Sequence, residues 1–325
     1  MILTAEQMNQ AVHGHIDREL LDGYCFFYRF TKAQRDYYKN TKFTPKERAS
    51  SAMYLEFITD AREIRFEYRQ DQASSQTFFF FDLYIDGKMV TKEGQESYTS
   101  PYEGIYEAIL PAGIKTVRIY FPNLSATGIR NLDLVKATFC TPTKRTRRSI
   151  AYGDSITQGY TSLSPSLTYV NLIGEALDAE MYDLGIGGEC FEPKMIDEHY
   201  PIKADFVTVA YGTNDWSHCS PKQDEPLRKG FFEKLVKAHG DSKIFVLLPI
   251  WRGNQNAENE GYGPLENYRN LLREELKIYP QITVIEGENL VPHHPDFFMP
   301  DLLHPNALGF TQYAKNLLTE LKKYL

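Results

Sequence analysis

The chain has 325 residues, of which 42% are hydrophobic and 24% are charged, and its formal net charge is −7. This composition is typical of a folded globular protein, and the length favours two domains over one. The excess of negative charge repels phosphate backbones and anionic lipids, so binding to nucleic acid or to a membrane surface is disfavoured.

The start of the sequence carries no sign of export or of a membrane anchor. Residues 1–10 lack the basic stretch and apolar core of a secretory signal. No run in the chain approaches the ~20 apolar residues that cross a bilayer. We therefore expect a cytoplasmic protein with no membrane partner.

The four cysteines are distant in the sequence and show no CxxC or CxxH spacing: Cys25, Cys140, Cys190 and Cys219. Neither a zinc cluster nor a disulfide framework is indicated by this pattern. We expect reduced, mostly buried thiols, no metal and no cofactor. Cys190 and Cys219 lie near two of the motifs described below, and they too are interpreted as structural thiols.

Residues 1–140 are predicted to form a β-sandwich domain. Short stretches rich in aromatic and β-branched residues alternate with turns, as in sandwiches. The predicted strands are residues 53–58, 63–69, 77–85, 106–110 and 116–121. Asp86-Gly87 predicts a tight hairpin after the third of them. Phe78 to Phe81 are interpreted as part of a buried strand, because successive strand residues point to opposite faces and cannot all line one ligand surface.

The next residues change in character. The segment TPTKRTRRS, from Thr141 to Ser149, has a proline and four basic residues but no apolar residue. Such a composition is typical of a solvated linker between domains. We therefore predict a linker at residues 141–148 and a second domain at residues 149–325.

From Ser149 onward, apolar strands alternate with helix-like stretches, which predicts a parallel sheet covered on both faces. The strands are expected at residues 150–154, 181–186, 206–210, 244–250 and 282–285, and the helices at 167–177, 227–239, 262–278 and 307–324. Ligands of such sheets bind beyond the carboxyl ends of the strands. Residues just after each strand are therefore the candidates for chemistry.

The elements of a serine-based acyl transfer follow these strand ends. Ser155 comes directly after the first strand, and Asp301 and His304 stand before the last helix. A serine hydroxyl needs an adjacent base, which a third group must orient. The gap of three residues lets Asp301 reach the Nδ1 side of the imidazole and leaves Nε2 for the serine. Pro305 favours an extended His304 just before a helix start.

Donors for a developing oxyanion are also available at the strand ends. They are the backbone N–H of Ser155, the backbone N–H of Gly188 and the side-chain amide of Asn214. Gly185 and Gly187 stand beside Gly188 and are alternatives for the second donor. Each residue alone is common in ordinary turns and helix caps, but the combination in this order predicts an ester hydrolase.

The C-terminal half resembles the SGNH, or GDSL, hydrolase superfamily. The matching motifs are Gly153-Asp154-Ser155, Gly188, Gly212-x-Asn214-Asp215 and Asp301-x-x-His304. The resemblance implies a flavodoxin-like three-layer α/β/α fold, with an oxyanion hole formed by Ser155, Gly188 and Asn214. Asp183 stands where the second motif usually begins with asparagine.

The N-terminal half resembles more loosely the jelly-roll-like β-sandwich that precedes some members, including carbohydrate acetyl esterases and the GxDLY group. The resemblance rests on Phe81-Asp82-Leu83-Tyr84 and Thr59-Asp60-Ala61, with Phe80 in place of the glycine. An α/β-hydrolase also runs serine, acid, histidine, but it expects GxSxG, and Thr157 stands at the last glycine.

The predicted function is removal of a small acyl group, acetyl, from a carbohydrate or a similar small ester. The substrate part rests on family analogy. The alternatives are a thioesterase or lysophospholipase, and a non-catalytic carbohydrate-binding protein. Trp216 and Trp251 follow two strand ends and are candidate walls of the substrate pocket, with core packing as the alternative. The sequence does not decide between a monomer and a homo-oligomer.

Overall fold

The computed structural model describes residues 1–73, 76–257 and 261–325, which fold into two compact units. The first unit comprises Met1–Thr31, Tyr38–Thr146 and Leu163–Ser166. The second comprises Lys32–Tyr37, Arg147–Ser162 and Leu167–Leu325. Each unit thus contains one short segment from the other half of the chain. The predicted limits of the linker stay a prediction.

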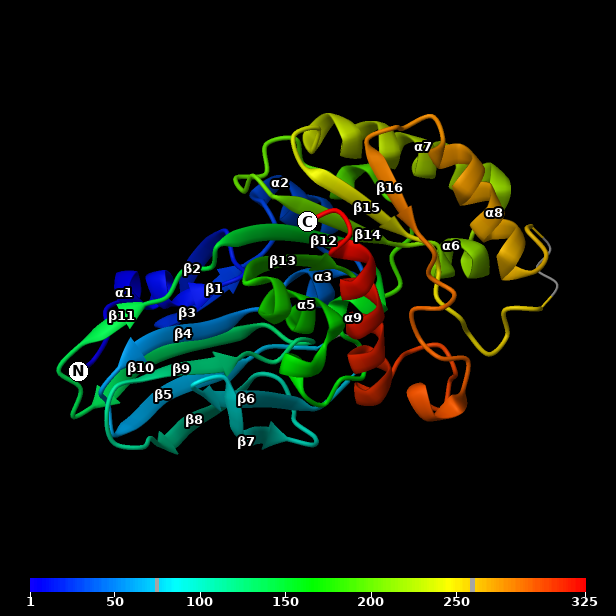
Figure 1. Ribbon diagram of the computed structural model, residues 1–325. Helices are drawn as coiled ribbons and strands as arrows, with labels where there is room; N and C mark the ends of the chain where they lie inside the picture. The colour runs from blue at the N-terminus through cyan, green and yellow to red at the C-terminus, as the bar shows by residue number, and fades with distance from the viewer. Residues whose placement is uncertain (74–75, 258–260) are drawn as a thin grey trace. The chain divides into compact units, whose positions relative to one another are not determined.

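Two antiparallel sheets form the first unit. One has the order β1-β4-β9-β6-β7, with β11 also paired to β4, and the other has the order β2-β3-β10-β5-β8 (Figure 1). The described elements are α1 (Ala5–Ala11), β1 (Val12–His13), β2 (Asp17–Leu21), β3 (Tyr24–Tyr28), α3 (Thr44–Glu47), β4 (Tyr54–Thr59), β5 (Glu63–Gln70), β6 (Phe79–Ile85), β7 (Lys88–Gln95), β8 (Tyr102–Ile109), β9 (Lys115–Tyr120), β10 (Thr127–Val135) and β11 (Cys140–Pro142). Apolar residues of both sheets share one core, which confirms the predicted sandwich.

The phenylalanine run on β6 shows how the alternation works. Phe79 and Phe81 are each 1% exposed and lie in the core, whereas Phe78 and Phe80 are half-buried. Ile85 then pairs with Lys88 across Asp86 and Gly87, whose φ angles are +48° and +76°. Two successive positive φ angles are those of a type I′ hairpin turn, so the predicted tight hairpin is confirmed.

The FDLY stretch contains a buried acid that holds another segment of the first unit. Asp82 is fully buried on β6, and its Oδ2 accepts the backbone N–H of Ser166 at 3.0 Å and the Ser166 hydroxyl at 2.6 Å. The Tyr84 hydroxyl donates to the same Ser166 oxygen at 3.1 Å. Burial raises the pKa of Asp82. The stretch thus anchors Leu163–Ser166, which follows the first motif in the sequence.

The basic segment predicted as a solvated linker is partly ordered. Thr141 and Pro142 belong to β11 and pair with β4. Arg145 is largely buried, because its guanidinium bonds Glu56 at 3.1 Å and the Tyr54 hydroxyl at 3.1 Å. Its charge is therefore paired within the first unit rather than solvated.

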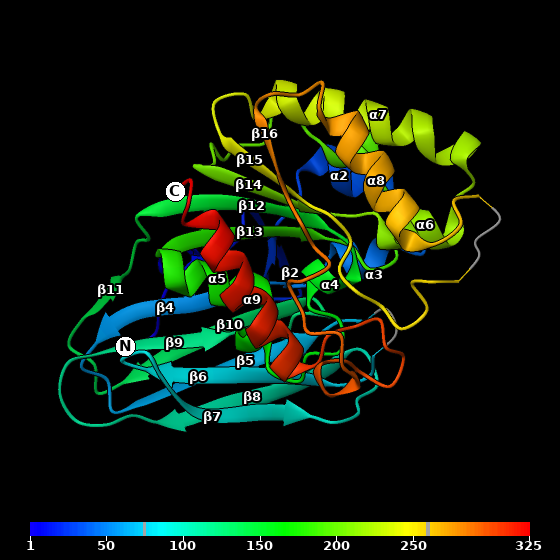
Figure 2. The ribbon, with the colours of Figure 1, turned by 45° about the vertical axis from the view of Figure 1, so that its right-hand side comes forward.

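The second unit has a five-stranded parallel sheet in the order β13-β12-β14-β15-β16. Helices α5 and α9 cover one face and α7 and α8 cover the other (Figure 2). The described elements are β12 (Arg147–Gly153), α4 (Ser155–Gln158), α5 (Tyr169–Leu177), β13 (Ala179–Gly185), η2 (Pro193–Met195), β14 (Phe206–Ala210), α6 (Thr213–His218), α7 (Pro221–Ala238), β15 (Lys243–Leu247), α8 (Leu265–Leu276), β16 (Ile282–Ile285), η3 (Pro295–Phe297) and α9 (Ala307–Leu321). Helix α2 (Lys32–Tyr38) also belongs to this unit, except for its last residue. The short η1 (Pro165–Leu167) has its first two residues in the first unit and its last residue in the second. The predicted three-layer fold is confirmed.

Strand order explains where the site forms. The first strand of this sheet, β12, has β13 on one side and β14 on the other. The connection that leaves β12 therefore runs to one side and the connection that leaves β13 crosses back to the other side, which opens a crevice at the carboxyl end of β12. The segments that follow β12, β13 and β14 all reach this crevice.

Helix α7 starts six residues before the predicted helix at 227–239. Ser220 and Gln223 form a capping box, and Pro221 occupies the first helical position. Both features mark helix starts. The capping residues therefore mark the start of α7 in the sequence, whereas the apolar periodicity alone placed it too late.

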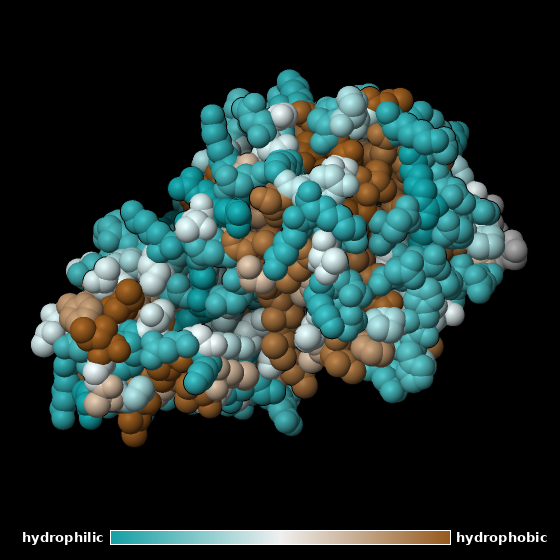
Figure 3. Space-filling view, viewed as in Figure 1, coloured by the Kyte–Doolittle hydropathy of each residue, from teal (hydrophilic) through white to brown (hydrophobic). Residues whose placement is uncertain are grey.

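The surface is mixed in character. On the face drawn in Figure 3, hydrophilic residues cover most of the area and apolar residues reach the surface in smaller patches. Large apolar side chains are also exposed on the first unit, among them Leu20, Ile105, Ile109 and Ile114. Among the described helices, none has the length and apolar character needed to cross a bilayer.

Candidate active site

Ser155 stands at the tight turn between β12 and α4. Asp154 caps this helix, since its Oδ1 accepts the backbone N–H of Ile156 at 2.9 Å. A Cβ added at Gly153 would lie 2.0 Å from Thr157 Oγ1, so only glycine permits the helix to fold back so closely on the strand. Ser155 begins the helix and keeps 9% of its surface exposed.

Two hydrogen bonds join Ser155 to the histidine and the aspartate predicted from the sequence. His304 Nε2 lies 2.8 Å from Ser155 Oγ, and His304 Nδ1 lies 2.6 Å from Asp301 Oδ2. The other carboxylate oxygen, Asp301 Oδ1, accepts the backbone N–H groups of Leu303 at 2.9 Å and His304 at 3.0 Å. The carboxylate is therefore fixed, and its free oxygen can only accept the Nδ1 proton, which leaves Nε2 as acceptor for the serine hydroxyl.

The electrostatics of this pair keep the imidazole neutral. Burial lowers the pKa of His304, Asp301 opposes that shift, and the positive charge of Arg252 lowers it further, so the net pKa is below its ordinary value. Burial pushes the pKa of Asp301 up, but hydrogen bonds from His304 and Leu303 outweigh it and the net pKa is lowered. At neutral pH the site thus holds a neutral base beside an ionised acid, the state needed to take a proton from serine.

The three glycines in and after the end of β13 differ in whether their backbone N–H groups are used. Gly185 donates its N–H to Asp183 Oδ1 at 2.7 Å, and Gly187 donates to Gln158 Oε1 at 2.8 Å. Gly188 is exposed, with φ +78°. Within the described ranges, the N–H of Gly188 has no acceptor. Of the three glycines, Gly188 is therefore the one with a donor to spare.

Asn214 lies on α6, just beyond β14, and is 8% exposed. Its Nδ2 donates to the backbone oxygen of Glu189 at 3.0 Å, which ties the helix to the loop that carries Gly188. An amide nitrogen has two hydrogens. In the part of the chain that the structure describes, the second hydrogen of Asn214 and the backbone N–H of Ser155 have no acceptor, so both can serve an incoming oxygen.

Arg252 is a site residue that the sequence analysis missed. It is 9% exposed, and its Nη1 donates to Thr213 Oγ1 at 3.0 Å and to Ser217 Oγ at 2.6 Å. These contacts hold the helix that carries Asn214. The available signal was a cation placed a few residues after the end of β15, at the same edge of the sheet as the other motifs.

The two candidate tryptophans pack differently from each other. Trp216 is 2% exposed, and its indole N–H donates to the Gly263 oxygen at 2.8 Å, so its ring offers almost no surface to a ligand. Trp251 is half-buried and its ring packs against Phe298 at 4.9 Å, before the loop of Asp301. The ring that touches the catalytic histidine candidate is Tyr160, which lies edge-on to His304 at 4.5 Å.

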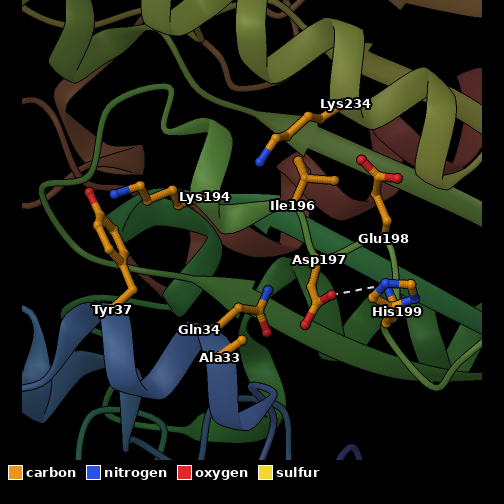
Figure 4. A pocket seen from close by; sticks show the side chains of 9 residues that line it. All are labelled: Ala33, Gln34, Tyr37, Lys194, Ile196, Asp197, Glu198, His199 and Lys234. Atoms are coloured by element: carbon orange, nitrogen blue, oxygen red, sulfur yellow. Dashed lines mark hydrogen bonds between the residues drawn. The ribbon is translucent and has the colours of Figure 1, made fainter.

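A separate cavity of about 400 Å³ lies elsewhere in the second unit (Figure 4). Its lining residues are Ala33, Gln34, Tyr37, Lys194, Ile196, Asp197, Glu198, His199 and Lys234. Its charges are partly paired, since Lys237 bonds Glu198 at 2.7 Å and Lys194 sits over the Tyr37 ring at 4.6 Å. It shares no residue with the serine site.

A serine, a histidine and an aspartate joined in this way beyond the strand ends of a parallel sheet are typical of hydrolases that act on esters through a serine. Residues 151–311 match the model of the GDSL-like lipase/acylhydrolase family. These residues therefore form a GDSL-like lipase/acylhydrolase domain, and the protein is an ester-hydrolysing enzyme. No curated protein sequence matches the chain.

Solved structures share the whole fold at low sequence identity. The salicylyl-acyltransferase SsfX3 from a tetracycline biosynthetic pathway is 19% identical, with a TM-score of 0.80 over 96% of this chain and 94% of its own. A GDSL-like lipase candidate from Bacteroides ovatus is 16% identical, with a TM-score of 0.78 over 99% and 97%. A family two carbohydrate esterase from Cellvibrio japonicus is 17% identical, with a TM-score of 0.67 over 97% and 96%. These likenesses concern the fold.

Proposed function

We propose that this enzyme removes a small acyl group, acetyl, from a carbohydrate or a similar small ester, with Ser155 as nucleophile. The observation that carries the proposal is the continuous hydrogen-bonded chain from Asp301 Oδ2 through His304 to Ser155 Oγ, at 2.6 and 2.8 Å. These distances are within the reach required for direct proton transfer. Gly188 and Asn214 are assigned as oxyanion donors because each has an N–H group without an acceptor among the described residues.

In the first half of the reaction, Ser155 Oγ attacks the ester carbonyl while His304 Nε2 takes the hydroxyl proton. Asp301 stabilises the imidazolium that forms. The carbonyl oxygen becomes an oxyanion, and the donors for it are the N–H groups of Ser155 and Gly188 and the amide of Asn214. His304 then returns the proton to the departing alcohol.

In the second half, water attacks the acyl-serine and His304 again accepts a proton. The same donors stabilise the second oxyanion, and collapse releases the acid and restores Ser155. Every proton in the cycle passes through one nitrogen, Nε2. Apart from the ester and water, the cycle uses only groups of this chain, so the proposal includes no cofactor.

Support for a sugar ester comes from the fold shared with the carbohydrate esterase described above. Support for a short acyl group comes from the N-terminal resemblance to carbohydrate acetyl esterases and from a sequence without a recognisable apolar lid segment. The walls of the acyl pocket are a further part of the proposal, with Trp251 and Trp216 as the candidates from the sequence. The burial of Trp216 makes Trp251 the better of the two.

The proposed substrate predicts how rate depends on acyl length. We expect kcat/KM on p-nitrophenyl esters to be highest for acetyl and to fall steeply by butyryl, because a pocket shaped for two carbons excludes longer chains. The measurement is a series from acetyl to octanoyl, run beside a set of acetylated sugars and with Ser155→Ala as the blank. Rates that rise through octanoyl would favour a lysophospholipase or thioesterase, and no hydrolysis of any ester would favour a carbohydrate-binding protein.

Asn214→Ala tests the third oxyanion donor. We expect kcat to fall roughly a hundredfold to a thousandfold with less change in KM, because the amide contributes mainly when the oxyanion forms. A thermal melt should accompany the kinetics, since Asn214 also ties α6 to Glu189. If only KM changes, the amide binds the ground state of the substrate and the assignment is wrong.

A further inference from the structure

Two thiols from different segments meet beside the proposed oxyanion donors. Cys190 lies in the loop after β13, two residues beyond Gly188, and Cys219 ends α6, the helix of Asn214. Their Sγ atoms are 3.4 Å apart and are joined by a thiol–thiol hydrogen bond. Both cysteines are free and only half-buried, so a small reagent can reach them.

The shared hydrogen bond makes the two thiols unequal. The hydrogen bond lowers the pKa of Cys219 and raises the pKa of Cys190. The thiolate is the attacking form, so Cys219 is taken as the first thiol to react and Cys190 as the resolving thiol. A disulfide needs the two sulfurs at about 2.05 Å, which is about 1.35 Å closer than the 3.4 Å that separates them in the reduced protein.

This junction also connects the loop to the helix through several other bonds. Asn214 Nδ2 donates to the Glu189 oxygen, the residue before Cys190. Asp215 Oδ1 accepts the backbone N–H of Phe191 at 2.8 Å, the residue after it. The backbone N–H of Cys219 in turn donates to the Asp215 oxygen at 3.0 Å. Drawing the sulfurs together therefore shifts the elements that position two of the proposed donors.

We propose that Cys190 and Cys219 are a reversible thiol-modification site, which a small-molecule disulfide oxidises to an internal disulfide that slows ester hydrolysis. Formation of the disulfide stands by itself, whereas its effect on rate rests on the proposed function. Misplacing a catalytic group by ~1 Å can cost on the order of a hundredfold in rate, so a smaller displacement of these elements is enough for an expected loss of about tenfold.

The chemistry balances without a further reactant. The Cys219 thiolate attacks one sulfur of the oxidant RSSR, whose S–S bond breaks and releases RS⁻. Cys190 then loses its proton and attacks the Cys219 sulfur, which releases a second RS⁻. Two cysteine thiols become one disulfide, and RSSR is reduced to two RSH, which carry the two protons.

A metal ion fits this cluster less well. Asp215 is the third potential ligand, within 4.8 Å of both sulfurs. Its Oδ1 and Oδ2 already accept the N–H groups of Phe191 and Gly212, at 2.8 and 3.0 Å. Burial also raises the pKa of Asp215 well above its ordinary value, which disfavours the carboxylate that a cation requires. The two sulfurs alone are a poor site for zinc.

The test uses glutathione disulfide as the oxidant on the wild-type protein, on Cys219→Ser and on the matched control Cys140→Ser. Free thiols and intact mass report the disulfide, and kcat and KM on p-nitrophenyl acetate report its effect. We expect the wild type to lose two thiols and two hydrogens of mass without an adduct. Its kcat should fall about tenfold, with KM changed less than about threefold, and dithiothreitol should restore it.

Cys140→Ser should respond as the wild type does, and Cys219→Ser should keep both its mass and its kcat. The proposal is overturned if the wild type keeps its thiols, carries stoichiometric zinc on them, forms only a glutathione adduct, or forms the internal disulfide with kcat unchanged. Reduced protein without esterase activity would contradict the proposed function instead. The thiol count and mass would then still decide whether the disulfide forms.

Discussion

Ser155→Ala is expected to abolish ester hydrolysis and to leave the fold intact. The hydroxyl supplies the covalent step, so kcat should drop on the order of a thousandfold or more. The side chain is small, begins a helix and keeps some exposure, so its loss creates no large cavity. The measurement is kcat on p-nitrophenyl acetate together with a thermal melt.

Ser149→Ala is the matched control on the same strand. Ser149 is fully buried on β12, and within the described chain its hydroxyl has no hydrogen-bond partner. Removing that hydroxyl should leave both rate and stability near those of the wild type. A serine-directed phosphonate should label the wild type and the control but not Ser155→Ala. Wild-type turnover by Ser155→Ala would refute the mechanism.

Asp301→Asn is expected to cause the second large loss, on the order of a thousandfold in kcat/KM. The backbone N–H groups of Leu303 and His304 hold one oxygen of Asp301 and would hold the Asn oxygen in the same place. The Asn amide would then face His304 Nδ1 and could only donate to it. The imidazole would carry its proton on Nε2, the nitrogen that must accept the serine proton.

The pH profile separates this role from a structural one. The rate rises with pH as His304 loses its proton, and its lowered pKa puts the acid limb of the wild type below about 6.5. Asp301 is the group that raises this pKa, so the acid limb should move to still lower pH in Asp301→Asn. Asp296→Asn, at an exposed acid of the same loop, should change neither rate nor profile. An unchanged rate and acid limb in Asp301→Asn would show that Asp301 is structural.

The site in the second unit could be predicted because the order of its strands determines which residues lie together. Residues at the ends of parallel strands must meet at one edge of the sheet, so Ser155 and the segments of Gly188 and Asn214 could be brought together from the sequence alone. The hydrogen bonds between Asp301, His304 and Ser155 have the geometry that their spacing predicted. Their catalytic roles stay a proposal.

In the first unit, the strands that were not predicted lack a regular alternation of buried and exposed residues. The strand β2, Asp17–Leu21, has no buried residue, and β7, Lys88–Gln95, has none either. The strand β10, Thr127–Val135, has a bulge between Arg130 and Asp133, and Asn131 there has φ +52°. A bulge shifts the inward-facing set by one residue and so removes the period that marks a strand.

Contacts between polar groups that are distant in the chain could not be predicted from the sequence, for a different reason. Two examples are the hydrogen bond between Cys190 and Cys219 and the hydrogen bond from Arg252 to Thr213. Both depend on loop conformations, which no residue pattern specifies. The same is true of Arg145, whose partners Glu56 and Tyr54 lie about 90 positions away in the chain. Composition alone described its segment as solvated.

The exchange of short segments between the units makes this enzyme hard to take apart. A single cut near residue 147 would separate the C-terminal half from helix α2, whose Gln34 donates to the Met195 oxygen at 2.6 Å and whose Tyr37 donates to Glu192 at 2.8 Å. It would equally remove Ser166 from Asp82. The esterase unit is therefore not a transplantable module, and a recombinant fragment or a domain swap at the apparent linker would yield two incomplete pieces.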